Sequence, residues 1–349
     1  MRGRKTRRVL FALIFLAAAT YVFREASGIR FPLPYLDLVT GERKWAIGLY
    51  EGSSPFSFQP PGKLSQPILR ARDVTDFAAV LVADPFLVRE KDRWLILFEA
   101  ADASGRGRIA WAEADSAGEN WEYRGVALEE DFHLSYPGVV REDGEWFLVP
   151  EMAAAGRQDL YRALEFPHRW EAAGTILPVP LKDPSLLSYA GNWYLFGCDL
   201  HWNLRLYLSA RLAGPWREHP ASPIVRGDRS RARPGGRMVV WEGRPVRYAQ
   251  DCEEEYGSAV RAFVVEVLTP DDYREKAADL PPVISASGRG WNRRGMHHLS
   301  PVEVSPSRWL AAVDGSPGRD KSLVFGWGDR LRRGRVEESA WESPSGGVD

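Results

Sequence analysis

One motif recurs five times along the chain, and a repeat of this kind restricts the possible folds more than any other feature of the sequence. Each copy begins with an Xaa-Pro pair near a short apolar run, and the prolines of the five pairs are Pro85, Pro137, Pro184, Pro234 and Pro301. A tryptophan follows at a nearly constant distance in most copies, at Trp94, Trp146, Trp193 and Trp309. The prolines lie roughly 50 residues apart, with an insertion in the fourth copy, and this is the length of a four-stranded propeller blade.

Within each copy, short β-rich runs alternate with turns that contain glycine or charged residues. Fourth runs begin at Trp121, Trp170, Trp216 and Tyr273. The fifth copy ends with residues 323–327 and lacks a last strand, which residues 45–50 could supply to close the ring. The sequence therefore predicts an all-β fold, a five-bladed β-propeller over residues 40–336, with a flexible tail over 337–349.

The amino terminus has the order of a secretory signal or signal anchor. Five basic residues, Arg2, Arg4, Lys5, Arg7 and Arg8, precede an uncharged, mostly apolar run over residues 9–23. This run is short for a spanning helix, which needs about 17–25 residues, so a cleaved signal peptide and a membrane anchor both stay open, beside a buried first helix. We assign residues 1–29 to this segment and predict a secreted or membrane-anchored protein whose propeller is extracytoplasmic.

Charge and cysteine content exclude several classes of function. The chain has 46 basic and 47 acidic side chains, a net charge of −1, whereas a nucleic-acid-binding protein normally carries a basic excess. Its two cysteines, Cys198 and Cys252, cannot form a disulfide framework or a four-cysteine zinc site, although one bridge between them is possible beside two free thiols. We predict no cofactor, no metal ion and no nucleic-acid partner.

The first strand of each propeller blade lines the central channel, so the starts of the five copies should gather around one axis. These positions carry Asp84, Tyr136, Asp183, Arg233 and Ser300, and three histidines lie nearby, His133, His297 and His298. The second strand of each copy ends near an acid, giving Glu99, Glu151, Asp199, Asp251 and Asp314. A pocket rich in carboxylates, histidines and aromatic rings indicates sugar binding or glycosidic chemistry.

Structural explanations compete with this one. An Asp-Pro pair is often only a turn device, the acids can be solvated strand ends, and the repeating tryptophans should pack between blades. Trp202 and Trp291 fall outside the repeat and could stack on a sugar. Neighbours on a strand point to opposite faces, so we expect one of His297 and His298 to face the channel and the other to pack.

At these residues the chain resembles a known family. The motifs Asp84-Pro85 and Asp183-Pro184, with five blades, are similar to those of the glycoside hydrolase family 43 and 32 superfamily of five-bladed propellers. Five further stretches more specifically resemble the amino-terminal propeller domain of glucosamine inositolphosphorylceramide transferases and of stand-alone bacterial relatives, and they are residues 45–52, 71–76, 132–137, 248–252 and 295–298. The resemblance covers residues 42–316.

The resemblance implies roles for individual residues. Asp84 takes the place of the base or nucleophile, and Asp183 that of the carboxylate that stabilises the sugar cation and tunes the acid. The fourth-blade glutamate that acts as general acid in the superfamily is absent, because Arg233-Pro234 stands there. Glu151 is our substitute candidate for the acid, since glycoside cleavage needs a proton donor opposite the attacking group. As further substrate-binding residues we predict Glu99, His133, Arg233, Asp251, His297 and His298.

An arginine cluster indicates an acidic substrate. It comprises Arg226, Arg229, Arg231, Arg233 and Arg237, and arginine binds phosphate and carboxylate bidentately, so a phosphoglycolipid or acidic surface glycan would fit. A solvated loop is the alternative. Two classes of function follow: an enzyme that acts on or transfers glycosyl units, and a non-catalytic glycan-binding or glycolipid-binding propeller that has lost the fourth-blade acid. The sequence does not predict an oligomeric state.

Overall fold

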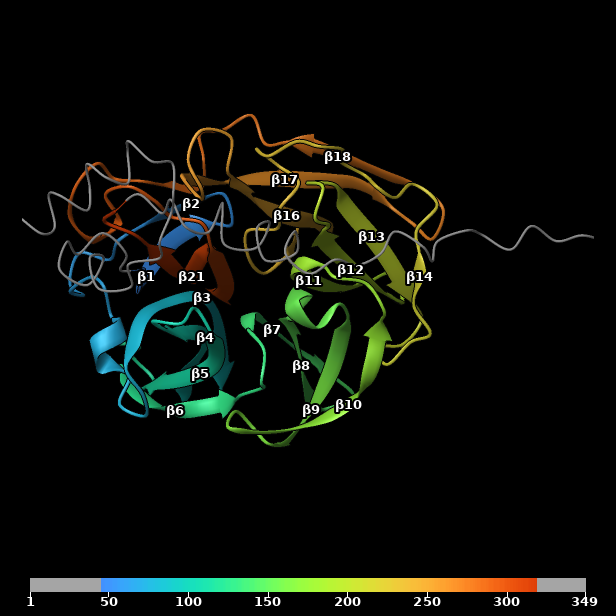
Figure 1. Ribbon diagram of the computed structural model, residues 1–349. Coiled ribbons are helices and arrows are strands. Elements are labelled where there is room, and N and C mark those ends of the chain that lie inside the picture. The colour runs from blue at the N-terminus through green and yellow to red at the C-terminus, as the bar shows by residue number, and fades with distance from the viewer. Residues whose placement is uncertain (1–44, 319–349) are drawn as a thin grey trace, which may run out of the picture. The chain divides into compact units, whose positions relative to one another are not determined.

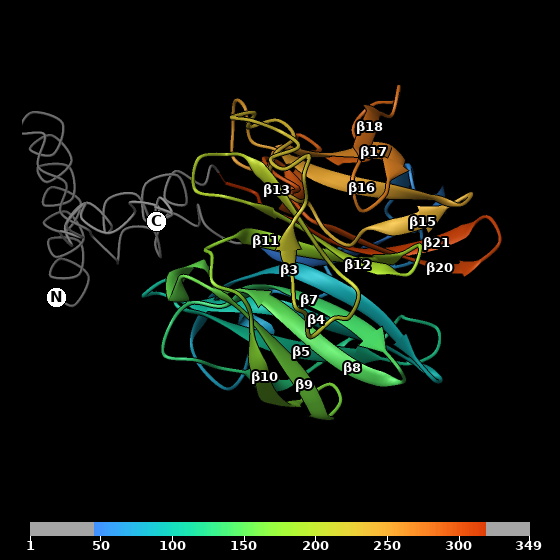
Figure 2. The same ribbon diagram turned by 90° about the vertical axis from the view of Figure 1, so that its right-hand side faces the viewer.

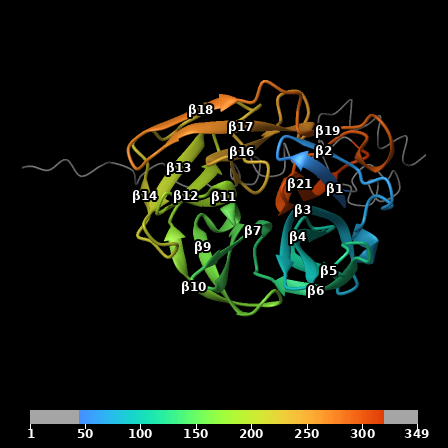
Figure 3. The same cartoon turned by 180° about the vertical axis from the view of Figure 1, so that it is seen from behind.

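Residues 45–318 are described by a computed structural model, in which the repeat folds into five β-sheets around a common centre (Figure 1). Figures 1 and 3 view the ring from opposite faces, and in both β3, β7 and β11 are among the strands nearest the centre. In the side view of Figure 2 the third blade lies between the second and the fourth. The predicted all-β, five-bladed propeller is confirmed.

Consecutive antiparallel strands build the first three blades. Blade 1 contains β3 (Ala79–Glu90), β4 (Arg93–Asp102), β5 (Gly107–Ala114) and β6 (Glu122–Leu128). Blade 2 contains β7 (Ser135–Glu142), β8 (Glu145–Glu151), β9 (Gln158–Glu165) and β10 (Arg169–Leu177). Blade 3 contains β11 (Lys182–Tyr189), β12 (Asn192–Cys198), β13 (Leu204–Ser209) and β14 (Arg217–Glu218).

The last two blades depart from this simple order. Blade 4 contains β15 (Val239–Trp241), β16 (Arg244–Asp251), β17 (Ala259–Leu268) and β18 (Tyr273–Ala277), with β19 (Ile284–Ser285) paired to β17. Blade 5 contains β20 (Leu299–Ser305), β21 (Arg308–Gly315), β1 (Ala46–Ser54) and β2 (Ser57–Gln59). Short 3₁₀ turns lie at η1 (Ala71–Asp73), η2 (Ala153–Ala155) and η3 (Gly290–Asn292).

The ring closes differently from the prediction. Residues 45–50 were expected to supply the last strand of blade 5, but β1 pairs directly with β21, from Ala46 opposite Gly315 to Gly52 opposite Trp309, and so takes the third position. The first five residues of β1 are buried, which suits an interior strand, whereas the three-residue β2 forms the edge. Residues 323–327 lie outside the described part of the chain.

The inner strand of blade 4 is interrupted at the start of the fourth copy of the motif, near Pro234. Pro234 makes only an isolated bridge to Ala249, and Gly236 makes a parallel bridge to Leu299 of the next blade. Gly236 has a φ of 130°, and a Cβ there would lie 1.8 Å from the Leu299 carbonyl oxygen. Only glycine permits this approach, which joins blade 4 to blade 5.

The hydrophobic core lies between neighbouring sheets. Trp94, Trp193 and Trp309 are buried in separate apolar clusters between blades, as expected for the repeating tryptophans. Trp202 and Trp291 are half-buried and pack against two of these clusters, so their surroundings favour packing over sugar stacking.

The structure also bears on the predictions about the cysteines and about the two ends of the chain. Cys198 and Cys252 are both buried and form no disulfide. The helices in residues 45–318 are too short to cross a bilayer. The predicted signal or anchor over residues 1–29 and the predicted tail over 337–349 lie outside the described residues.

Candidate active site

Four buried acidic side chains from three blades gather at the centre of the ring. Asp84 comes from β3, Glu99 from β4, Glu151 from β8 and Asp183 from β11, and each is less than a tenth exposed. Burial and the negative charges of Asp84, Glu151 and Asp183 raise the pKa of Glu99 well above its usual value. The negative charges of these side chains act on one another, which shows that they lie near one another. The structure therefore brings together the predicted catalytic residues and Glu99.

A shared backbone distortion positions the inner-strand residues. Asp84, Tyr136 and Asp183 each precede proline, have φ values of 51°, 45° and 53°, and lie where the pairing with the second strand shifts register. Positive φ in such residues costs about 1–3 kcal/mol each. Because the distortion occurs with tyrosine as well as aspartate, it belongs to the blade architecture, and in blades 1 and 3 it presents a carboxylate.

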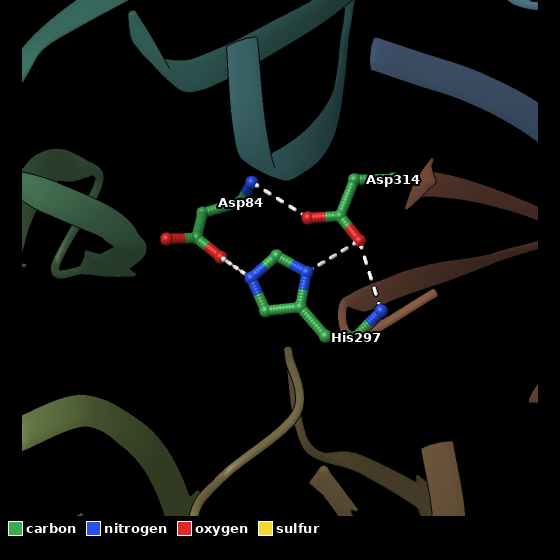
Figure 4. Close-up of side chains that lie close together, drawn as sticks. All are labelled: Asp84, His297 and Asp314. Carbon is green, nitrogen blue, oxygen red and sulfur yellow. Dashed lines mark hydrogen bonds and ion pairs between the residues drawn. The ribbon is translucent and has the colours of Figure 1, made fainter. Parts of the chain in front are cut away.

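His297 bridges two aspartates (Figure 4). Its Nε2 lies 3.2 Å from Asp84 Oδ1, and its Nδ1 lies 2.8 Å from Asp314 Oδ1. Burial disfavours a charged imidazole, but the two carboxylates outweigh it and raise the pKa of His297 well above its usual value. In turn, burial alone would raise the pKa of Asp84, yet hydrogen bonds and positive charge from His297 and His298 hold it far below the ordinary range. Asp84 is therefore a fixed anion.

Asp314 organises this arrangement, a role that the sequence did not reveal. Its Oδ2 accepts the backbone N–H of Asp84 at 3.1 Å, and its Oδ1 accepts those of His297 and His298 at 3.1 and 3.0 Å in addition to the His297 ring. Asp84, His297 and Asp314 offer ligand atoms within 4.8 Å of one another, a spacing that a metal ion could use. Because both Asp314 oxygens already accept N–H donors, Asp314 acts as the hydrogen-bond acceptor that holds the His297 ring beside Asp84, with which His297 forms an ion pair.

His298 departs from the prediction that adjacent histidines point apart. Its Nδ1 lies 3.5 Å from the same Asp84 oxygen that His297 approaches, while its ring packs edge-on against Phe86 and Tyr136, with centroids 5.0 Å apart in both cases. The alternation rule fails because both histidines precede the start of β20 at Leu299, so they are outside a strand.

Glu151 and Asp183 form the second half of the site. The Asp183 backbone N–H donates to Glu151 Oε2 at 3.3 Å. Burial and the charge of Asp183 raise the pKa of Glu151 to about 8, against the opposing charge of Arg233. Glu151 is therefore protonated at neutral pH, as a proton donor must be.

Arg233 forms an ion pair with Asp183 and lies close to Glu151. Its Nε and Nη2 both contact the Asp183 carboxylate, and Nη2 lies 3.9 Å from Glu151. Gln250 adds a hydrogen bond to Asp183 at 2.6 Å, and Tyr256 lies with its ring centroid 5.1 Å from the Arg233 guanidinium. Sequence reasoning missed Gln250 and Tyr256, although Gln250 lies within one of the stretches that carry the family resemblance.

The Tyr136 side chain of blade 2 bonds to the two blades that follow it. Its hydroxyl lies 2.6 Å from Ser185 Oγ of blade 3, and it both donates to the Gly236 carbonyl at 2.9 Å and accepts the Gly236 N–H at 2.8 Å. The side chain is fully buried. Three blades therefore meet at one hydroxyl group.

Other predicted site residues lie at the margin or elsewhere. His133 lies at the margin: it accepts the Gly107 N–H at Nδ1, and its Nε2 is 3.7 Å from Glu99. Asp251 binds Arg261 of its own blade at 2.9 Å, and its described contacts do not include the central carboxylates, so its predicted role in substrate binding stays a prediction.

The predicted arginine cluster is likewise divided among separate partners. Arg229 stacks over Trp202, with its guanidinium carbon 4.3 Å from the ring centroid, and Arg231 pairs with Asp228. Arg233 is occupied by Asp183. These three arginines therefore do not converge on one anion.

Comparison with known proteins places the chain in a family. Residues 39–316 match the family described as glucosamine inositolphosphorylceramide transferase 1, N-terminal. The chain belongs to this family. It is 35% identical over 318 residues to glucosamine inositolphosphorylceramide transferase 1 of Oryza sativa subsp. japonica, and 33% identical over 300 residues to that of Arabidopsis thaliana.

These alignments cover 83% and 78% of this chain, but 43% and 39% of the rice and Arabidopsis proteins. The chain thus spans less than half the length of the curated relatives that it matches. Among solved structures, a family 43 β-xylosidase/α-arabinofuranosidase from a compost microbial metagenome superimposes with a TM-score of 0.50 at 15% identity, over 66% of this chain and 84% of the enzyme. This likeness concerns the propeller fold.

Proposed function

We propose that the propeller binds a glycan at its centre and breaks or transfers a glycosidic bond there. The observation that carries the proposal is the opposite ionisation of two acids in one buried cluster: Asp84 is held as an anion by two histidines, and Glu151 keeps its proton at neutral pH. Environments that drive the pKa values of neighbouring acids apart are the usual means of assigning acid and base roles to them.

The geometry suggests how the two acids divide the reaction. Asp84 Oδ1 faces His297, whereas the second oxygen, Oδ2, points away from it and is available to a substrate (Figure 4). In the proposed first step Oδ2 attacks the anomeric carbon, the glycosidic bond breaks, and Glu151 gives its proton to the leaving oxygen. Water or an acceptor hydroxyl then displaces Asp84 and returns a proton to Glu151. Asp183 keeps Glu151 protonated through its negative charge.

The substrate class follows from the family. The relatives are named for transfer to inositolphosphorylceramide, and we extend this to a glycosylated phosphoinositol lipid or another acidic surface glycan as the substrate of this chain. The basic and apolar segment over residues 1–29 supports contact with a membrane and an extracytoplasmic propeller.

Substitution of the two aspartates tests the proposal. Asp84→Asn and Asp183→Asn should each lower turnover of a glycosylated inositol phospholipid by about 10²–10⁴-fold, measured by mass spectrometry of the released or transferred sugar. Asp199→Asn is the matched control, because Asp199 directly follows a second strand, and among residues 45–318 its carboxylate bonds to His201, Asn203 and Arg205 in the loop and strand that come next. Equal turnover in all three variants would exclude a catalytic role for the central acids.

One observation favours a second function, a glycan-binding propeller without turnover. Arg233 stands where the superfamily has its general acid, and it neutralises Asp183. Under this alternative the wild type would bind sugars on a glycan array, Asp84→Asn would weaken that binding, and none of the bound glycans would be cleaved or transferred.

A further inference from the structure

Three arginines of the fourth blade reach into the interior, and one of them has no counter-charge. Arg233 pairs with Asp183, and Arg247 binds both oxygens of Glu275 at 2.8 and 2.7 Å. The Arg237 side chain makes neither a hydrogen bond nor an ion pair with any residue in the described range 45–318.

The backbone fixes where this arginine lies. Its N–H donates to the Leu299 carbonyl at 3.2 Å, directly after Gly236, to which the Tyr136 hydroxyl is bonded. From there the side chain crosses toward blade 1, where its guanidinium carbon lies 5.8 Å from the centroid of the Phe86 ring. Arg237 therefore lies directly beside the point where the Tyr136 hydroxyl joins blade 2 to the start of blade 4.

The three guanidinium nitrogen atoms of Arg237 differ in their exposure to solvent, and this determines which of them a ligand can contact. Nε and Nη2 are closed off from water and have no partner, while Nη1 is the guanidinium nitrogen that keeps accessible surface. A ligand can therefore meet the guanidinium at Nη1, on the side where the half-buried side chain keeps contact with solvent.

The positive charge of Arg237 has no negative partner among the described residues. Burial lowers the pKa of Arg237 to about 10, with no carboxylate to offset it, so the group still carries its charge at neutral pH. An uncompensated buried charge is costly, and a negative ion at Nη1 would reduce that cost.

We propose that Arg237 binds a small inorganic anion next to the Phe86 ring. A halide such as chloride suits a single accessible nitrogen beside an aromatic ring, and phosphate shares the required charge. This site does not depend on the proposed glycosidic activity, because it involves none of the residues assigned to it.

Anion exchange on the intact chain tests the site. Thermal unfolding is followed while sodium gluconate is replaced by sodium chloride, or by phosphate, at constant ionic strength. For the wild type we expect the Tm to rise with the logarithm of the concentration of the bound anion. A larger response to phosphate than to chloride identifies an oxyanion as the ligand. Arg237→Met should abolish the response and should have a higher Tm than the wild type in gluconate, because it removes the uncompensated charge.

Two controls keep the result interpretable. Arg226→Gln, at an exposed arginine in the same region, should respond like the wild type, and Arg237→Lys keeps the charge if the methionine variant does not fold. Crystals grown in sodium bromide should show an anomalous peak in contact with Arg237 Nη1. The proposal is overturned if the wild-type Tm is the same in all anions, if Arg237→Met keeps the response, or if neither bromide nor phosphate is found at Arg237 in crystals grown with that anion.

Discussion

Asp84 and Glu151 are both buried carboxyl groups, yet their surroundings give them opposite charge states. Two histidines face Asp84, and a second aspartate faces Glu151. The sequence suggested both residues, because each occupies a repeated position in its blade. The partners that set their charges, His297 for Asp84 and Asp183 for Glu151, could not be paired with them from spacing alone, since each partner belongs to another blade.

The protonated state of Glu151 should be visible in stability. In the unfolded chain this carboxyl has its ordinary pKa of 4.5, whereas in the folded protein its pKa is raised to about 8, so between these pH values the folded state holds the extra proton. Stability of the wild type should therefore fall as pH rises across this window, by about 1.4 kcal/mol per pH unit. Urea unfolding from pH 5 to 8 should show a shallower dependence for Glu151→Gln, and the exposed Glu145→Gln on the same strand should match the wild type. Identical slopes in all three proteins would contradict the assignment.

Asp314 should control the charge of His297. Because Asp314 raises the pKa of His297, the stability from this contact is present at low pH and is lost as pH rises through the folded-state pKa. Asp314→Asn should lower the His297 pKa and should destabilise the fold by about 3–5 kcal/mol, since it breaks a buried ion pair. Nitrogen NMR of labelled histidine rings follows the titration, with the exposed His168 as an internal reference. A His297 signal that titrates at the wild-type pH in the variant would show that Asp314 does not hold its charge.

At the scale of strands, periodicity predicted the blades well and their junctions poorly. The run lengths around Trp94, Trp146 and Trp193 mark hairpins that form within one blade, so local sequence is sufficient for them. The third position of β1 in blade 5 and the interruption of the inner strand near Pro234 depend on contacts between distant segments. A pattern of apolar residues does not specify such neighbours.

Gly236 offers a test of the junction between blades 4 and 5. A Cβ at this position would meet the Leu299 carbonyl at 1.8 Å, and φ is 130°. Gly236→Ala should therefore destabilise the protein by about 3 kcal/mol or more in urea unfolding. Gly243→Ala is the control, because Gly243 also has a positive φ of 76° but open space around it, and it should cost about 1 kcal/mol. Similar losses in both variants would mean that the close approach is unimportant.

At the scale of the whole molecule, the two ends of the described chain meet in one sheet. β1 pairs with β21 along seven residue pairs, from Ala46 to Gly52, so the ring is sealed by strands that are far apart in sequence. This closure makes blade 5 dependent on the segment from 45 to 59.

Removal of that segment should abolish the folded ring. A chain that lacks residues 45–59 leaves β21 as an unpaired edge and exposes apolar surface, and such edges promote aggregation. We expect the truncated protein to be insoluble or to lack the cooperative thermal transition of the full chain, as followed by circular dichroism. Phe58→Ala within β2 is the milder comparison, and it should keep the transition at a lower temperature. A soluble truncated protein with an unchanged transition would show that four blades are sufficient.

The Tyr136 hydroxyl group, held by Ser185 and Gly236, has a consequence for how far the blades can shift against one another. Tyr136 belongs to blade 2, Ser185 to blade 3, and Gly236 directly precedes blade 4, so one buried group ties three consecutive blades together. Glu151, Asp183 and Arg233 come from these same three parts of the chain. Any shift that separates these side chains would first have to leave a buried hydrogen-bonding group without its partner, which is costly.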